Sequence, residues 1–200
     1  MYVSKPAQPS VAVLHESSMA VDYYQRNLPH WQPEECSIFI TWRLFGSLPV
    51  GFAEHLRKWE KEPSKQFLAA DRKLDEASIG PRWLSDPEIA VHTHEAIKHG
   101  AKLGQYVLRA YVIMPNHVHV LLDPLVPLSR ITSGIKGVSA RSSNLKLGRT
   151  GKPFWQDESF DHWIRNPGQF VSTKKYIENN PVRAGLCNNP QVWPWSSAHK

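Results

Sequence analysis

Hydrophobic and polar residues alternate in three segments of the chain, and this is the periodicity of β-strands. Residues 36–44 place two isoleucines and a tryptophan on one face. The alternation returns in residues 105–114 and again in residues 117–122, after Pro115 and Asn116. Because proline and asparagine favour tight turns, the second and third segments predict an antiparallel hairpin.

Apolar residues three or four positions apart predict helices elsewhere. One helix begins after Gly51 without a clear end, and others span residues 86–99, 129–147 and 166–180. Two of these open with Asp-Pro or Asn-Pro, an N-cap followed by proline at the first helical position. An aromatic-rich stretch at residues 154–163 predicts one more short strand.

This order predicts an α+β fold. Without the helix at residues 86–99, which we interpret as an insertion, and without the last helix, it is the β-α-β-β-α-β order of a ferredoxin-like antiparallel sheet. Residues 60–80 give no clear prediction. We divide the chain into an N-terminal arm (1–33), one domain (34–186) and a C-terminal tail (187–200) packed on or near the domain.

Composition adds a hypothesis about partners and compartment. The formal net charge of +6 and the pI near 9.4 fit a polyanionic partner, although a basic protein without one fits equally. Cys36 and Cys187 lie too far apart for a CxxC motif or a disulfide framework, which favours a reducing cytoplasm. No stretch approaches the roughly 20 apolar residues that span a bilayer, so we expect no membrane segment.

Two histidines on one strand are the first candidate site. His117 and His119 leave the same face of the strand, while the residues between and after them leave the other. Two imidazoles at this spacing can bind one divalent metal, with further oxygen donors from elsewhere. A pair of exposed strand histidines without a metal is the simpler alternative.

The last helix supplies a second candidate. At helical spacing Phe170, Lys174 and Ile177 form the predicted buried side. The opposite side consists of Gln169, Ser172, Tyr176 and Asn180. The phenol and the amide could therefore face one point, although a surface tyrosine and a helix-ending Asn-Pro explain the same pattern.

Several strings, in order along the chain, resemble the REP-associated tyrosine transposases of the single-tyrosine HUH superfamily. They are MPNHVHVLL (114–122), FWQ (154–156), DHWIR (161–165) and YIENNPVRAGL (176–186), flanked by RNLPHW (26–31), TWRL (41–44) and WPWSS (193–197). The resemblance therefore covers nearly all of the chain.

That resemblance implies a DNA nickase and strand transferase. His117 and His119 would bind a divalent metal, Asn180 would be the third protein ligand, and Tyr176 would be the nucleophile. The tyrosine, on the C-terminal helix, would form a 5′-phosphotyrosine link with single-stranded DNA at hairpin-forming REP-type palindromes. Mg²⁺ is a candidate ion because it is abundant in cells, and Mn²⁺ is a second candidate because imidazole ligands suit it better than they suit Mg²⁺. With three neutral ligands, the ion would keep its full charge.

Basic residues near the proposed site are candidates for DNA contacts. They are Lys136, Arg141, Arg165, Lys174, Lys175 and Arg183, each of which could equally be a solvated surface residue. Trp155 and Trp163 could stack on bases, but tryptophans more often fill a core, so we assign neither. The sequence is compatible with a monomer or a homodimer, and with Tyr176 serving its own or a partner's site.

Two other functions remain open from the sequence. A domesticated DNA-binding protein would keep the fold without turnover. A metallohydrolase would use the histidine pair with an activated water, but Asp123 is the only acid next to the pair in sequence, so such a site would lack a base.

Overall fold

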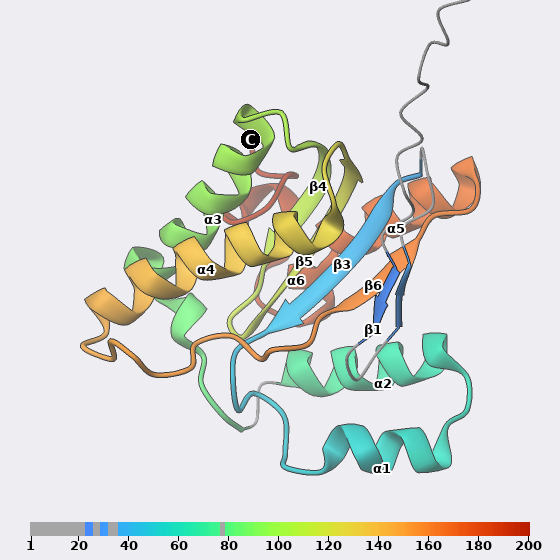
Figure 1. The fold of residues 1–200 in the computed structure, drawn as a ribbon, viewed down its shortest axis with the longest axis horizontal. Coiled ribbons are helices and arrows are strands. Elements are labelled where there is room, and N and C mark those ends of the chain that lie inside the picture. The colour runs from blue at the N-terminus through green and yellow to red at the C-terminus, as the bar shows by residue number, and fades with distance from the viewer. Residues whose placement is uncertain (1–22, 26–28, 32–35, 77–78) are drawn as a thin grey trace, which may run out of the picture.

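A four-stranded antiparallel sheet in the order β4-β5-β3-β6 lies at the centre of the computed structural model (Figure 1). The structure describes residues 23–25, 29–31, 36–76 and 79–200. The strands of this sheet are β3 (Ile38–Arg43), β4 (Tyr106–Ile113), β5 (His117–Pro124) and β6 (Phe160–Trp163). The helices are α1 (Phe52–Trp59), α2 (Pro63–Glu76), α3 (Pro87–Lys102), α4 (Leu128–Lys146), α5 (Pro167–Glu178) and α6 (Asn180–Arg183).

Shorter elements complete the chain. Single 3-10 turns form at Trp83–Ser85 and Pro190–Val192. Most of the predicted N-terminal arm lies outside the described residues, but β1 (Tyr23–Gln25) and β2 (Pro29–Trp31) form a separate antiparallel pair. None of the helices described here combines the length and the apolar character needed to cross a membrane.

The strand order confirms the predicted antiparallel α+β sheet. β5 lies between β3 and β4, and β3 lies between β5 and β6, as in a split β-α-β fold. Helices α3 and α4 cover one face, and α5 packs on the other (Figure 1). The sheet therefore has two covered faces, and the histidine strand β5 is one of its two inner strands.

The prediction that the helix at residues 86–99 is an insertion is wrong. This segment forms α3, whose Ile89 and Ile97 are fully buried in the core beneath α4. A helix that buries such a stripe connects two strands of the sheet, whereas α1 and α2 form the additional pair beside the sheet (Figure 1). The inserted segment is therefore the region for which the sequence pattern gave no clear prediction.

Alternation along β5 assigns its side chains to two cores. Val118 and Val120 enter the larger core under α3 and α4. His117 and His119 point to the opposite face, which carries a second, smaller core that includes Phe39. That face is not exposed, because both imidazoles are at most 1% accessible.

A β-bulge interrupts the alternation predicted for residues 105–114. The register of β4 against β5 shifts between Leu108 and Ala110. Leu108 and Ala110 therefore enter different cores, although strict alternation places them on one face. The extra residue, Arg109, donates from Nε to Asp123 Oδ2 at 2.7 Å.

The C-terminal tail pairs with the outer edge of β4. Ile113 N donates to Trp195 O at 2.8 Å, and Ser197 N donates to Tyr111 O at 2.9 Å. Trp193 and Trp195 pack against the smaller and the larger core, respectively. The tail thus covers backbone groups that an edge strand would otherwise leave unpaired.

Gly80 provides a test of how the inserted helices are joined to the sheet. Its φ is +75°, and a Cβ at this position would lie 2.2 Å from Gly46 O. Gly80→Ala should therefore cost clearly more than the roughly 1–2 kcal/mol of a left-handed residue. Gly148 has a φ of +64° and open space around it. Gly148→Ala should therefore lower the stability only by the cost of the left-handed conformation. Equal losses of stability in urea unfolding would contradict the steric argument.

Candidate metal and nucleophile site

The two histidines of β5 converge on one point. Their Nε2 atoms lie 3.1 Å apart. The Nδ1 of His117 lies 2.7 Å from the side-chain oxygen of Asn116, and the Nδ1 of His119 lies 2.7 Å from Thr41 Oγ1. An amide oxygen only accepts, so His117 carries its proton on Nδ1 and Nε2 is free to bind a metal.

Asn116 also connects the histidine strand to the inserted helices. Its Nδ2 donates to Leu74 O on α2 at 3.0 Å. The turn residue predicted to join the hairpin therefore orients one imidazole and anchors α2 at the same time. This contact explains how the insertion reaches the site.

Helix α2 adds a buried carboxylate to the histidine pair. Asp71 Oδ1 lies 3.1 Å from His119 Nε2 and 3.6 Å from His117 Nε2. The three side chains each offer a ligand atom, all within 4.8 Å of one another. Asp75, one turn later, lies 3.8 Å from His117 Nε2. The sequence predicted three neutral ligands, and the structure places a carboxylate beside two of them.

Helix α5 and the start of α6 add the tyrosine and the asparagine. The Tyr176 hydroxyl donates a hydrogen bond to Asp71 Oδ2. Asn180 is fully buried, and its Nδ2 lies 3.2 Å from His119 Nε2. The tyrosine and the asparagine therefore lie beside the histidine pair.

The donor set fits a divalent cation. Asp71 Oδ1 and Asn180 Oδ1 are buried and accept no hydrogen bond from the described residues. Buried polar atoms without a partner are costly, and a cation would satisfy them. A flip of the Asn180 amide would place its oxygen beside His119. Ligands about 2.1 Å from one ion at right angles lie about 3.0 Å apart, close to the Nε2 separation.

Burial and neighbouring charges set the protonation of the site. Burial opposes ionisation of Asp71, but His119 and then His117 outweigh it and hold the pKa of Asp71 well below its usual range. Burial, together with His119, lowers the pKa of His117 to about 3, so this imidazole is neutral at pH 7, as a metal ligand must be. Burial and the charge of Asp71 raise the pKa of Tyr176. The phenol therefore keeps its proton until a cation or a base acts on it.

Arg183 is the predicted DNA-binding cation that lies next to the tyrosine. Its Cζ is 4.5 Å from the centre of the Tyr176 ring. Its Nη2 is 3.5 Å from Asp75 Oδ2 and 4.0 Å from Asp71 Oδ2. The side chain is 41% exposed, so it can contact a phosphate that approaches the phenol.

The two candidate cations on α4 lie across the sheet from this site. Lys136 Nζ donates to the carbonyls of Gln156 and Asp157, each at 2.7 Å, and so holds the loop before β6. Arg141 is exposed on the same helix. The structure does not bring these two side chains to the tyrosine.

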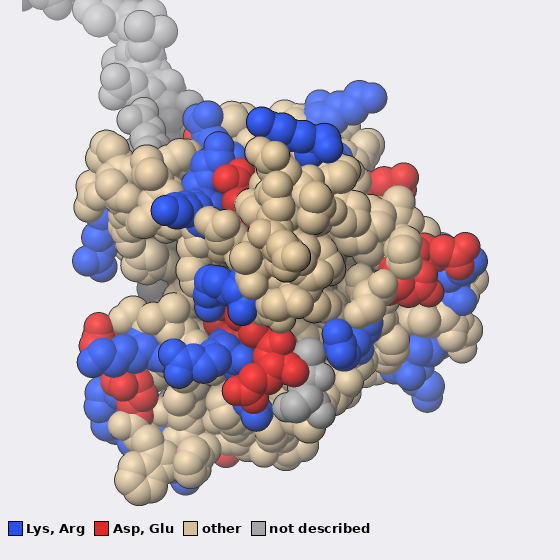
Figure 2. Space-filling model, turned by 180° about the vertical axis from the view of Figure 1, so that it is seen from behind, with Lys and Arg blue, Asp and Glu red and all other residues tan. Residues whose placement is uncertain are grey.

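The remaining candidates lie on or beside α5. Arg165 packs over the ring of Trp163 at 5.2 Å, and Lys174 lies 4.0 Å from Glu178. Lys175 is exposed. Figure 2 shows basic side chains scattered over the face behind that of Figure 1, with acidic groups among them. Contacts of these residues with DNA stay predictions.

The predicted division of the last helix into two sides is wrong in part. Lys174 is 45% exposed, whereas Tyr176 packs with Ile177 on the side that faces the sheet. The helix ends at Glu178, and Asn180 begins the short α6 before Pro181. A polar residue lies on the side of the helix that faces the sheet because the site on the sheet is buried and itself polar.

The acidic residues of α2 were missed by sequence reasoning. A usable signal exists, since Phe67, Asp71 and Leu74 are spaced as i, i+4 and i+7 on one helix face. A carboxylate inside an apolar stripe indicates a buried charge that needs a partner. The partner is the histidine pair.

Comparisons with known proteins match the part of the chain that carries the histidine pair and the tyrosine. The family model described as "Transposase IS200 like" matches residues 82–180, which include both histidines, Tyr176 and Asn180. A REP-associated tyrosine transposase of Escherichia coli (strain K12) is 27% identical over 99 residues. That match covers 48% of this chain and 56% of the relative, so this chain spans about half the length of the curated relative.

A solved structure shares the fold. It is a REP-associated tyrosine transposase bound to a REP hairpin, with a TM-score of 0.57 and 18% identity. The superposition covers 86% of this chain and 82% of that one. The family match, the curated relative and the shared fold confirm the resemblance read from the sequence, and residues 82–180 of the chain are similar to the IS200-like transposases.

Proposed function

We propose that the protein is a metal-dependent nickase and strand transferase for single-stranded DNA, acting on REP-type hairpins through Tyr176. One observation carries the proposal: the Tyr176 hydroxyl and both imidazoles contact the same buried carboxylate, Asp71. Because they share this neighbour, the nucleophile and the metal donors are close enough to act on the same phosphate. The REP hairpin bound in the related structure supports the substrate class.

The two oxygens of Asp71 have different neighbours. Oδ1 faces the imidazole nitrogens, and Oδ2 accepts the hydrogen bond of the Tyr176 hydroxyl. His117, His119 and Asp71, with Asn180, would hold Mg²⁺ or Mn²⁺. When bound, the ion polarises the phosphate that is attacked. Asp71 is then placed to take the phenolic proton.

The reaction is an exchange of one ester bond for another. The Tyr176 oxygen attacks the phosphorus, the bond from phosphorus to the 3′ oxygen breaks, and that oxygen leaves as a 3′-hydroxyl after protonation. A 3′-hydroxyl can later attack the phosphotyrosine, which reverses the step or joins another strand. Arg183 is placed to hold a phosphate oxygen beside the phenol.

Metal removal tests this function. Wild-type protein mixed with a REP-type hairpin oligonucleotide and Mn²⁺ should form a covalent adduct on a denaturing gel. EDTA should lower its rate on the order of 10²-fold or more, because metal polarisation contributes several kcal/mol, and added Mn²⁺ should restore it. An adduct that forms equally fast in EDTA would contradict metal dependence. Tight hairpin binding without metal-stimulated cleavage would indicate a domesticated DNA-binding protein.

A metallohydrolase is favoured more by the structure than by the sequence. Asp123 is not at the site, because it pairs with Arg109 and Ser37. Asp71 and Asp75, however, place two carboxylates beside the imidazoles, and either could activate a water. Multiple-turnover release of a free 5′-phosphate by Tyr176→Phe protein would establish this function instead.

A further inference from the structure

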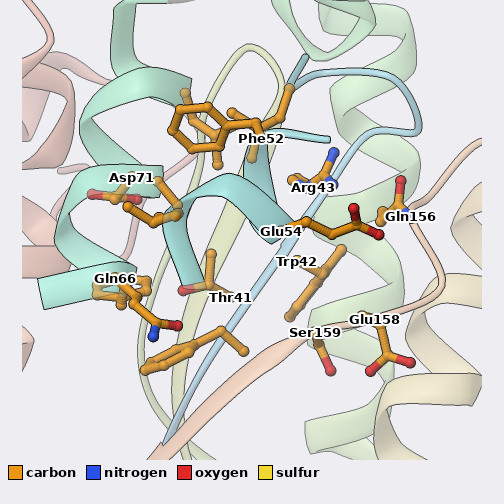
Figure 3. Close-up of a pocket in the computed structure, with 16 residues that line it drawn as sticks. Thr41, Trp42, Arg43, Phe52, Glu54, Gln66, Asp71, Gln156, Glu158 and Ser159 are labelled. Carbon is orange, nitrogen blue, oxygen red and sulfur yellow. The ribbon is translucent and has the colours of Figure 1, made fainter. Parts of the chain in front are cut away.

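A cavity of about 410 Å³ opens beside the tyrosine, between the helices α1 and α2 and strand β3 (Figure 3). Asp71 forms part of its wall, so the cavity adjoins the site described above. Its volume lies in the range of small-molecule pockets. Neither the histidines nor Tyr176 line it, and the proposed transfer reaction leaves it without a role.

Aromatic rings form much of this wall. Phe52, Phe67 and Phe160 come from α1, α2 and β6, respectively, and the rings of Phe67 and Phe160 stack at 4.4 Å. Such surfaces bind the faces of unpaired bases without regard to which base is present. The cavity can therefore hold a planar heterocycle.

Two polar side chains in the wall have unused hydrogen-bonding capacity. Within the described part of the chain, the Arg43 guanidinium pairs with no carboxylate, and its hydrogen bond to Ser47 Oγ is long at 3.4 Å. The Gln156 amide makes no side-chain hydrogen bond to the described residues, while its backbone N donates to Arg43 O at 2.9 Å. Both side chains lie at one end of the cavity in Figure 3. They can together bind the edge of a ligand.

The charge of the wall argues for a base and against a phosphate. Glu54, Glu158 and Asp71 line the cavity, and Arg43 is the one Lys or Arg side chain among the lining residues. A phosphate would therefore find a single basic side chain among the lining residues. A neutral ring with hydrogen-bonding groups at its edge needs no further cation and can stack on the phenylalanines.

We propose that this cavity takes one unpaired base of the DNA strand beside the phosphate that Tyr176 attacks. The base stacks on the phenylalanines, and Arg43 and Gln156 bind its edge. This inference rests on the proposed function. A base in a single-stranded segment needs no unpairing from a duplex to enter the cavity. The inserted helices then select the strand position at which cleavage occurs.

Fluorescence of 2-aminopurine tests the cavity. The probe is placed, one position at a time, in the single strand flanking the hairpin, and the oligonucleotides are bound to Tyr176→Phe protein with Mn²⁺. We expect the emission to change at one position next to the cleavage site. Removing the base there should weaken binding on the order of tenfold, because stacking of one base is typically worth a factor of about 5 to 150.

Gln156→Leu should weaken binding of the intact strand severalfold and leave binding of the abasic strand unchanged. Arg43→Met serves as a second variant with the same expectation. Gln105→Leu, just before the start of β4, is the matched control and should bind both strands as wild type does. Thermal unfolding with Mn²⁺ shows that each variant folds and keeps the metal site.

Equal losses on intact and abasic strands would overturn the proposal, as would base removal without effect at every flanking position. Because this experiment measures binding and not cleavage, it tests the base-binding cavity separately from the proposed strand transfer. A change in emission at one position, with no covalent adduct in the wild type, would overturn the proposed function but support the base-binding role of the cavity. Adduct formation without a base signal would overturn the cavity alone.

Discussion

Tyr176→Phe protein is expected to form no covalent adduct with a 3′-labelled REP-type hairpin in Mn²⁺. The label belongs at the 3′ end because a 5′-phosphotyrosine holds the downstream strand. Loss of a nucleophile that no neighbour replaces typically costs at least about 10⁴-fold in rate. Phenylalanine keeps the ring that packs against Phe39 and Arg183, so hairpin binding should persist.

Tyr111→Phe is the matched control for this change. Tyr111 lies in the core on the opposite face of the sheet, and its hydroxyl lies 3.2 Å from His94 Nδ1. The variant should lose about 1 kcal/mol of stability with that hydrogen bond and form the adduct at the wild-type rate. An adduct of normal yield in Tyr176→Phe protein would exclude Tyr176 as the nucleophile.

Local periodicity explains why most of the fold could be predicted. The alternation of residues 36–44 and of the His117 hairpin follows from the geometry of each strand alone. Whether a helix covers the sheet or stands beside it depends on packing far away in sequence. The stripe of Ile89 and Ile97 has the same pattern in either case, so the inserted helices were misidentified.

The residues of the site also differ in whether local sequence could predict them. Strand geometry places His117 and His119 on one face, and this is a local property. Asp71 reaches them only through the tertiary position of α2, which no local pattern specifies. Polarity was also misleading along α5, because Tyr176 faces a buried polar site and so looked like a surface residue.

Asp71→Asn should weaken metal binding on the order of 10²-fold or more, because it removes the one charged group among the metal donors. The change conserves volume, so it creates no cavity in the core. Bound metal stabilises the fold in proportion to its affinity. At a Mn²⁺ concentration of about 100 times the wild-type Kd, the wild type should gain about 2.7 kcal/mol and the variant about 0.4 kcal/mol. Thermal unfolding with and without Mn²⁺ measures both gains.

The same substitution should lower adduct formation more than metal binding alone explains, because a side-chain amide is a poorer acceptor for the phenolic proton than the carboxylate that it replaces. Saturating Mn²⁺ should therefore restore the rate only in part. Asp123→Asn is the matched control, since Asp123 also lies on the sheet but pairs with Arg109. It should keep the full metal-induced stabilisation. Equal stabilisation of the Asp71 and Asp123 variants by Mn²⁺ would remove Asp71 from the metal site, leaving the imidazoles and Asn180 as its donors.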